Sequence, residues 1–253
     1  MAEKLQALGV DGVEWRINDD GKHFRPQHLK KEALEIRRIS EAHHLDVPIL
    51  STYLPVSHIP EIQEVIEAAA SIGVGLVRAI APRYEGELHH RQLYEDAVKN
   101  LERLEEITSV RKVKAVLEIH MGSIIPSASA AFGLVRHFDP DCIGVIFDPG
   151  NMVWEGMENW RMGLEMLGSY LSHVHVKNSL WSRIGESEHG SMMWKPSMCP
   201  LREGIVNWGE VIGSLKKVNY RGYLSIEDFS EELPPEERIQ DDLRYLSALE
   251  RAR

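Results

Sequence analysis

Four side chains that can bind a cation stand at the ends of successive β-type segments. Strand residues point alternately to two faces, so a polar residue between aliphatic residues faces away from them. In AVLEIHM, Leu117 and Ile119 therefore face one way, and the carboxylate between them faces the other. Related alternation marks GVIFDPGN, SHVHVKN and YLSIED. The pattern predicts side chains directed toward one interior, namely Glu118, Asp148, His175 and Glu227.

Three carboxylates and one imidazole are a ligand set for a divalent cation. Oxygen and nitrogen ligands without a thiolate suit Mn²⁺, Mg²⁺, Co²⁺ or Zn²⁺. Without a cation the crowded carboxylates would repel one another, and their pKa values would rise. Taken singly, each residue has an ordinary explanation, such as a solvated glutamate or the turn chemistry of DPGN. Because the four strands are consecutive, we expect a metal site formed by Glu118, Asp148, His175 and Glu227.

Other polar side chains belong to the same strand ends and the loops that follow them. His173 lies two residues before His175 and on the same face of the strand, so we expect it to support a ligand from a deeper position. Salt bridges within the sheet, such as Glu14 with Arg78, are an alternative role for two of the others. Our candidates for substrate contacts are His120, Lys177, Arg78, Glu14, Asn151, Trp181 and Arg183.

Strand-like and helix-like segments alternate along the whole chain. Apolar residues at i, i+4 and i+7, as in Leu29, Ala33 and Ile36, predict helices between the strands. Such alternation predicts parallel strands joined by helices, in an open doubly wound sheet or a (β/α)8 barrel. Polar residues at the strand ends favour the barrel. The predicted strands are residues 12–16, 47–53, 75–81, 114–121, 143–149, 172–178 and 222–228.

The number of strands falls one short of a complete barrel. The chain opens with EKLQALGV, which has the pattern of a helix that should follow a first strand. We therefore expect a single (β/α) barrel domain over residues 1–253 that lacks its first strand. Either two strand edges stay unpaired, or another segment fills the place.

A long segment follows the strand that carries His175. Residues 179–206 exceed the usual length of a βα connection, and such loops are often functional. We expect this segment to hold Trp181 and Arg183 over the site as a lid. The alternative is an oligomer contact, because exposed Met and Trp residues also mark interfaces.

Composition excludes several classes of protein. A formal net charge of −10 over 253 residues argues against a nucleic-acid partner, which Lys and Arg would have to attract. No apolar run is long enough to span a bilayer, so we expect no membrane partner. The two cysteines, Cys142 and Cys199, form no disulfide framework, and a cytoplasmic location is the expectation.

The order of these segments resembles the xylose isomerase-like TIM-barrel superfamily of sugar and sugar-phosphate isomerases and epimerases. The segments that carry the resemblance are LGVDGVEWR, VLEIH, GVIFDPGN, SHVHVKN, REGIVNW and GYLSIED. The resemblance implies the same four metal ligands, and it implies that Glu118 and Glu227 also move the proton. It also implies that the family's first strand is the one that is missing.

Three residues depart from the family pattern. Asn178 and Asn207 stand where Asp is frequent, and Asn151 stands where several members have His. That His belongs to the three-zinc cluster of the AP endonuclease branch, and the other extra ligands of that cluster are not visible here. The departures therefore make a DNA-repair nuclease the last of the alternatives.

The resemblance and the residues together predict a divalent-metal-dependent isomerase or epimerase of a sugar-like α-hydroxy carbonyl compound. One glutamate would take the α-proton to form an enediolate, which the metal stabilises as a Lewis acid, and the other would return the proton. Loss of water begins with the same proton abstraction, so a metal-dependent lyase similar to inosose or dehydroshikimate dehydratase is the alternative. A non-catalytic sugar-binding barrel is a further one. The expected partner is a small sugar or polyol-derived molecule, and the superfamily implies a homodimer or homotetramer.

Overall fold

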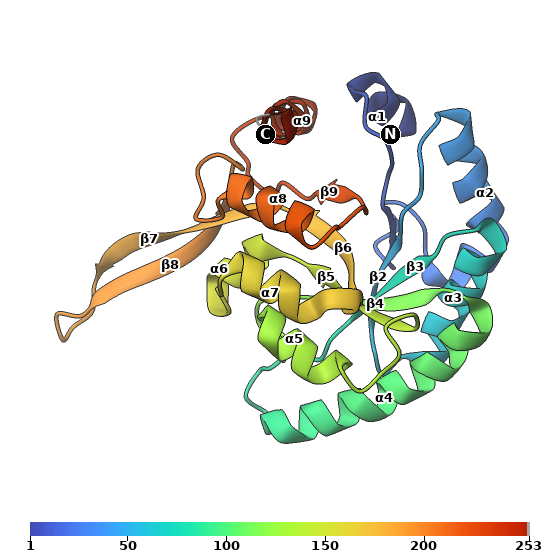
Figure 1. Cartoon of the computed structure of the whole chain (residues 1–253), viewed down its shortest axis with the longest axis horizontal. Coiled ribbons are helices and arrows are strands. Elements are labelled where there is room, and N and C mark those ends of the chain that lie inside the picture. The colour runs from blue at the N-terminus through green and yellow to red at the C-terminus, as the bar shows by residue number, and fades with distance from the viewer. Residues whose placement is uncertain (252–253) are drawn as a thin grey trace.

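A curled sheet of parallel strands forms the centre of the fold, and helices cover its outer face (Figure 1). The structure is a computed structural model that describes residues 1–251. All seven strands expected from the sequence are present, and their order in the sheet follows the chain. They are β1 (Trp15–Ile17), β2 (Leu50–Pro55), β3 (Leu76–Ile80), β4 (Lys114–Glu118), β5 (Ile143–Phe147), β6 (Leu171–Val176) and β9 (Leu224–Ile226).

The helices lie between the strands in the chain, as the apolar spacing predicted. On α2, the residues at that spacing, Leu29, Ala33 and Ile36, are all buried. Pro60 lies in the first turn of α3 and Pro235 begins α9, positions where the missing N–H costs no hydrogen bond. The α-helices are α1 (Ala2–Leu8), α2 (Leu29–Ala42), α3 (Ile59–Ile72), α4 (His90–Arg111), α5 (Ala128–Val135), α6 (Pro149–Glu155), α7 (Trp160–Leu167), α8 (Trp208–Lys217) and α9 (Pro235–Arg251), and two short 3₁₀ helices are Pro26–His28 and Gly168–Tyr170.

The two faces of the sheet have different partners. Outward side chains such as Leu117 and Val174 belong to the main apolar core, which the helices complete. Inward side chains that come before the polar strand ends form a small separate cluster of Ile49, Val116 and Ile146. Because alternate residues share a face, the position two residues after Val116 is also inward. This apolar cluster therefore lies beneath the polar residues at the strand ends, and we call it the floor of the barrel.

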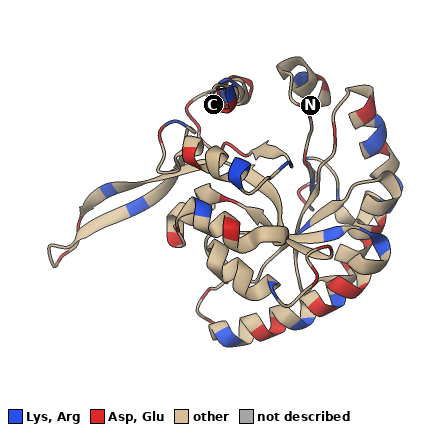
Figure 2. Ribbon diagram, viewed as in Figure 1, with Lys and Arg blue, Asp and Glu red and all other residues tan. Residues whose placement is uncertain are grey.

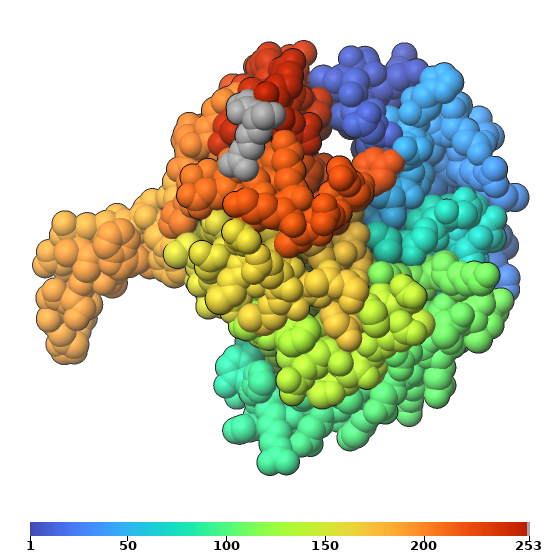
Figure 3. Space-filling view, in the orientation of Figure 1, coloured from blue at the N-terminus to red at the C-terminus, as the bar shows by residue number. Residues whose placement is uncertain are grey.

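The sheet has two free edges, β1 and β9, which do not pair with each other. A cleft of about 300 Å³ separates them, lined by residues 10–14 on one side and 223–227 on the other. Figure 3 shows an opening at this place, between the blue N-terminal segment and the orange segment that contains β9. The expectation of a seven-strand barrel wall with a gap at the first strand is confirmed.

Residues 179–206 do not form the irregular lid that the sequence indicated. Most of them belong to an antiparallel hairpin of β7 (Asn178–Glu186) and β8 (Met192–Cys199). This hairpin projects away from the barrel wall (Figure 1). Polar and apolar residues do not alternate along its strands, because both faces of the projecting part are exposed to solvent. The sequence therefore carried no burial pattern that would have predicted the two strands.

Acidic and basic side chains alternate along the outer helices, most clearly on α4 (Figure 2). No helix within residues 1–251 combines the length and the apolarity that crossing a membrane requires.

Asn178, at the base of the hairpin, uses its whole amide group in hydrogen bonds. Its Nδ2 donates to the carbonyl oxygens of Leu201 and Val206 at 2.8 and 3.0 Å. Its Oδ1 accepts from the N–H groups of Ser179 and Val206, both at 2.9 Å. An aspartate could not donate to the two carbonyls, so this departure from the family pattern has a structural reason.

We predict that Asn178→Asp lowers the free energy of unfolding by about 2–5 kcal/mol, because it leaves buried carbonyl oxygens facing a carboxylate. Urea unfolding measures the change. Asn207→Asp is the matched control. Asn207 caps α8 through its side-chain oxygen, and Asp caps helices equally well, so this change should be nearly neutral. Equal stability of Asn178→Asp and the wild type would contradict the prediction.

Candidate metal centre

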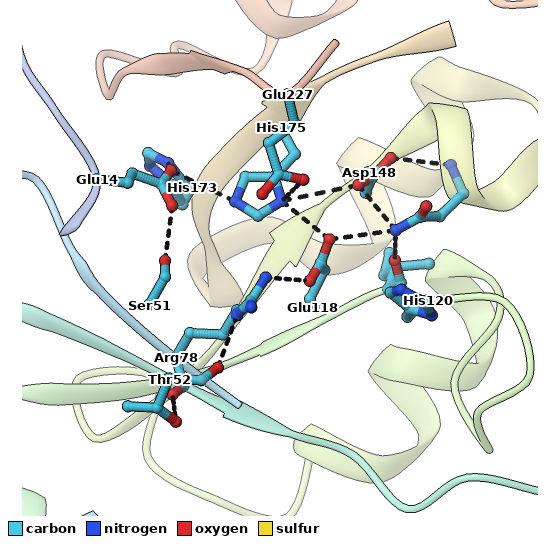
Figure 4. A network of polar contacts seen from close by, with 12 residues as sticks. Glu14, Ser51, Thr52, Arg78, Glu118, His120, Asp148, His173, His175 and Glu227 are labelled. Atoms are coloured by element: carbon cyan, nitrogen blue, oxygen red, sulfur yellow. Dashed lines mark hydrogen bonds and ion pairs between the residues drawn. The ribbon is translucent and has the colours of Figure 1, made fainter. Parts of the chain in front are cut away.

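Glu118, Asp148, His175 and Glu227 converge at the carboxyl ends of β4, β5, β6 and β9 (Figure 4). One potential ligand atom from each lies within 4.8 Å of those of the other three. The Nδ1 of His175 lies 2.9 Å from Glu118 Oε1, 3.2 Å from Glu227 Oε2 and 3.7 Å from Asp148 Oδ2. All are buried except Glu227, whose side chain is 21% exposed. The structure thus brings together all four predicted ligands.

Lys177, a candidate for a substrate contact, lies inside this cluster. Its Nζ is 2.8 Å from Asp148 Oδ2, 2.5 Å from Glu227 Oε2 and 3.5 Å from Glu118 Oε1. The side chain is buried, since two residues after His175 is again an inward position. An ammonium group therefore stands among the carboxylates and neutralises part of their charge.

Arg78 supplies a second buried cation. Its Nη1 donates to Glu118 Oε2 at 2.6 Å, and its Nε donates to the carbonyl oxygen of Thr52 at 3.2 Å. The Glu14–Arg78 pair considered from the sequence is not present, because Glu14 has other partners. Arg78 thus holds one oxygen of Glu118 in place.

The positive groups determine the charge states of the carboxylates. Burial raises the pKa of Glu118, but Arg78, His175 and Lys177 outweigh it and hold that pKa well below its usual range. Burial also opposes the ionised form of Glu227, yet His175 and Lys177 lower its pKa to about 2. For Asp148, burial dominates and raises the pKa. The site therefore favours ionised Glu118 and Glu227 in the pH range where most enzymes work.

Glu14 forms a second layer behind His175. Its Oε1 lies 2.6 Å from His173 Nε2 and 3.4 Å from His175 Nε2, and its Oε2 accepts from Ser51 Oγ at 2.6 Å (Figure 4). The two imidazole rings meet edge to face with their centres 5.5 Å apart. His173 is thus in the supporting position that the sequence analysis predicted. Glu14, a candidate for substrate contact, instead faces the side of His175 opposite to the carboxylates.

Asn151, a candidate for a substrate contact, instead contacts two of the proposed ligands. Its Nδ2 donates to Asp148 Oδ2 at 2.8 Å and to Glu118 Oε1 at 3.1 Å. Asp148 in turn caps α6 by accepting from the Asn151 N–H at 2.9 Å. The first turn of α6 therefore orients both carboxylates.

A cavity of about 370 Å³ lies directly beside the cluster. This volume is within the range of about 300–1,000 Å³ that is usual for small-molecule sites. Arg78, His120 and Lys177 line it, as expected from the sequence. Among the other residues of the wall, four polar or aromatic ones were not sequence candidates: Tyr53 on β2, and Arg83, Ser123 and Phe229 in the segments after β3, β4 and β9.

Trp181 and Arg183 are not brought to this cavity. Both lie on β7, because the segment that carries them is a projecting hairpin and not a lid. Trp181 Nε1 donates to the carbonyl oxygen of Val153 at 2.8 Å, and Arg183 pairs with Glu186 of the same strand at 3.0 Å. Their predicted contact with substrate therefore has no support in the position of the hairpin.

Comparison with known proteins gives a family and a fold. A family model described as xylose isomerase-like TIM barrel matches residues 2–249. The curated relatives include an inosose dehydratase of Clostridium perfringens, 22% identical over 155 residues, which are 58% of this chain and 51% of that protein. An inosose dehydratase of Mesomycoplasma hyopneumoniae is 25% identical over 142 residues, 54% of this chain and 47% of that protein. The chain thus spans about half the length of the curated relatives that it matches.

Three solved structures show the same fold over most of the chain. The IolI protein with a bound zinc atom has a TM-score of 0.76 and 20% identity, covering 98% of this chain and 90% of that one. The 3-keto-D-glucoside 4-epimerase YcjR of E. coli has 0.75 and 17%, covering 98% and 92%. The probable 3-DHS dehydratase AsbF of Bacillus anthracis has 0.73 and 18%, covering 97% and 92%. Since the family model covers nearly the whole sequence, the chain belongs to the xylose isomerase-like TIM-barrel family.

Proposed function

We propose that the protein is a divalent-metal-dependent enzyme that moves a proton next to the carbonyl group of a sugar-like substrate. An isomerase or epimerase that works through an enediolate is the first form of this proposal. The observation that carries it is the convergence of three carboxylates and one imidazole beside a cavity of about 370 Å³. The dehydratases and the epimerase among the related proteins also support proton transfer next to a carbonyl group.

The residues of the cluster fit a divalent ion. The three carboxylates of the cluster carry three negative charges, and the two cations that pair with them, Arg78 and Lys177, leave one of these charges unbalanced. Glu118, Asp148, His175 and Glu227 would hold the ion, and Mn²⁺, Mg²⁺, Co²⁺ and Zn²⁺ all suit such ligands. The zinc atom in the IolI structure, which shares this fold, supports a metal-dependent function. When bound, the ion supplies a Lewis acid for the substrate oxygens.

Glu227 is better placed than Glu118 to take the proton. Its side chain lines the cavity and is 21% exposed, whereas that of Glu118 is 3% exposed and held by Arg78. We assign the first proton abstraction to Glu227. In an isomerase or epimerase, Glu118 would return a proton that it has gained from solvent, and Glu227 would release its own proton to solvent.

A lyase is the second candidate. The curated relatives are inosose dehydratases, and the ion pair with Arg78 makes Glu118 a weaker proton carrier, which favours chemistry with one base. In this form Glu227 removes the α-proton. The β-hydroxyl group then leaves as water with a proton from His120 or Lys177, which line the same cavity. The product is an enone or its equivalent.

Two further expectations belong to the proposal. The buried free thiols Cys142 and Cys199 agree with a reducing location such as the cytoplasm. Association into a homodimer or homotetramer stays a prediction from the superfamily.

We predict that Asp148→Asn weakens Mn²⁺ binding at least about 100-fold, because it removes a charged ligand and breaks a completed set. The variant should fold, because Asn caps a helix as well as Asp does and can still begin α6. Isothermal titration calorimetry measures the dissociation constants. Glu210→Gln, on the outer face of α8, is the control. A wild-type protein that binds no divalent ion would refute the proposed function.

We predict that Glu227→Gln lowers turnover at least about 10²-fold while the fold persists, because the amide cannot accept the proton. Wild-type enzyme incubated in deuterated buffer with a panel of ketoses and inososes provides the measurement. Deuterium in a rearranged sugar identifies an isomerase or epimerase, and an ultraviolet-absorbing enone identifies a lyase. Glu231→Gln, four residues further along the chain, serves as the control. Full activity of Glu227→Gln would rule out the assignment of the base.

We predict that Glu14→Gln weakens metal binding by about 10–100-fold, the usual effect of losing a carboxylate that orients a ligating histidine. The amide keeps the shape but replaces one acceptor oxygen with a donor, so it cannot accept from both His173 and Ser51 as Glu14 does. It also removes the negative charge that lies 3.4 Å from His175 Nε2. Calorimetry with Zn²⁺ and the visible spectrum of the Co²⁺ form report the change. Ser51→Ala, which removes only one contact to Glu14, should have a smaller effect. An unchanged affinity would show that Glu14 does not orient His175.

A further inference from the structure

We propose that the substrate carries an anionic group, a carboxylate or a phosphate, and that Arg83 binds this group from the wall of the cavity beside the metal ligands. This inference rests on the proposed function, since it takes the metal cluster as the end where the reaction occurs. It defines the substrate class beyond a sugar-like carbonyl compound.

Arg83 has a fixed backbone at the wall of the cavity. It follows β3 and lines the same space as Glu118 and Glu227. Its neighbours are joined to the segment after β4 by two backbone hydrogen bonds, from the Tyr84 N–H to the Gly122 carbonyl oxygen at 2.9 Å and from the Ile124 N–H to the Pro82 carbonyl oxygen at 3.0 Å. The loop position of Arg83 is therefore determined by the main chain and needs no contact from its side chain.

The guanidinium group of Arg83 is available to a ligand. Its side chain is 59% exposed, and within residues 1–251 its recorded ion pair is with Glu85 at 3.5 Å, whose side chain is also exposed. Gly122 leaves room for it, since a Cβ at that position would lie 3.1 Å from Arg83 Nη2. Exposed pairs at such distances contribute little free energy, so an anionic ligand can replace Glu85.

The charge of the metal-loaded site also favours an anion. Three ligands carry negative charge, while Arg78, Lys177 and a divalent ion together carry four positive charges. The carboxylate of Glu14 behind His175 balances the remaining positive charge, so Arg83 at the wall supplies the positive charge that is left for a ligand. A positive site in a chain of formal net charge −10 is complementary to an anionic substrate and not to a neutral polyol.

Two aromatic rings also form part of the cavity wall. Tyr53 and Phe229 line the space and are each more than 40% exposed. The guanidinium carbons of Arg16 and Arg78 lie 4.4 and 4.6 Å from the centre of the Tyr53 ring, and Lys177 Nζ lies 5.2 Å from that of Phe229. These cations restrain the rings, and the exposed parts of the rings offer apolar surface to the carbon skeleton of a substrate.

Binding of matched compounds to the Mn²⁺-loaded protein tests the inference. Quinate is compared with myo-inositol, which are a carboxylated and a neutral cyclic polyol, and glucose 6-phosphate is compared with glucose. In at least one pair the anion should bind about tenfold to hundredfold more tightly, the effect of one charge-assisted hydrogen-bonding group. The pair with the larger ratio shows whether the anionic group is a carboxylate or a phosphate.

Arg83→Gln should abolish the preference for the anion. Arg91→Gln, which removes the same charge from the exposed surface of α4, should retain it. The inference is wrong if neither anion binds at millimolar concentration, if neutral and anionic compounds bind equally, or if Arg83→Gln keeps the preference. Failure of the proposed function appears separately, as a wild-type protein that takes up no Mn²⁺ in the same titrations.

Discussion

The buried negative charge at the top of the sheet is the constraint on which the rest of the structure depends. Glu118 and Asp148 lie in an interior that disfavours ions, so each needs cations or hydrogen-bond donors at short range. The neighbouring strands supply them, with Arg78 on β3 and Lys177 directly after β6. A divalent ion in the same place would meet the same requirement with more charge. The cluster thus explains why so many polar side chains are tolerated inside the barrel wall.

The fold meets this constraint through simple alternation along each strand. Outward aliphatic residues bind the sheet to the helices, and inward residues stand above the apolar floor of Ile49, Val116 and Ile146. Because the strands are parallel and consecutive, their carboxyl ends bring one functional residue each to the same point. Glu14 contacts the side of His175 that faces away from the carboxylates. His173 contacts both Glu14 and the ring of His175.

These arrangements differ in how far the sequence predicts them. Period-two alternation predicted the seven strands, their faces and the convergence of the four ligands, since each depends on residues close in the chain. The partners of Arg78 and Glu14 depend on distances between different strands, and the sequence does not show how neighbouring strands are aligned. The hairpin was missed because strands without a buried face lack the alternating pattern. Arg83 was missed because a charged residue after a strand looks like any solvated loop residue.

The free edge of the sheet has a consequence for the energetics of the site. β9 has three residues, and within residues 1–251 its ladder partner is β6 alone, yet Glu227 follows it directly. A short strand held on one side opens locally at a small cost compared with global unfolding. An ion bound by Glu227 together with ligands on β4, β5 and β6 would stabilise the pairing of β9 with β6. Part of the free energy of ion binding would then go into ordering β9. The metal-free and metal-loaded proteins would then differ most in the hydrogen-exchange protection of β9, while the floor of the barrel stays the same.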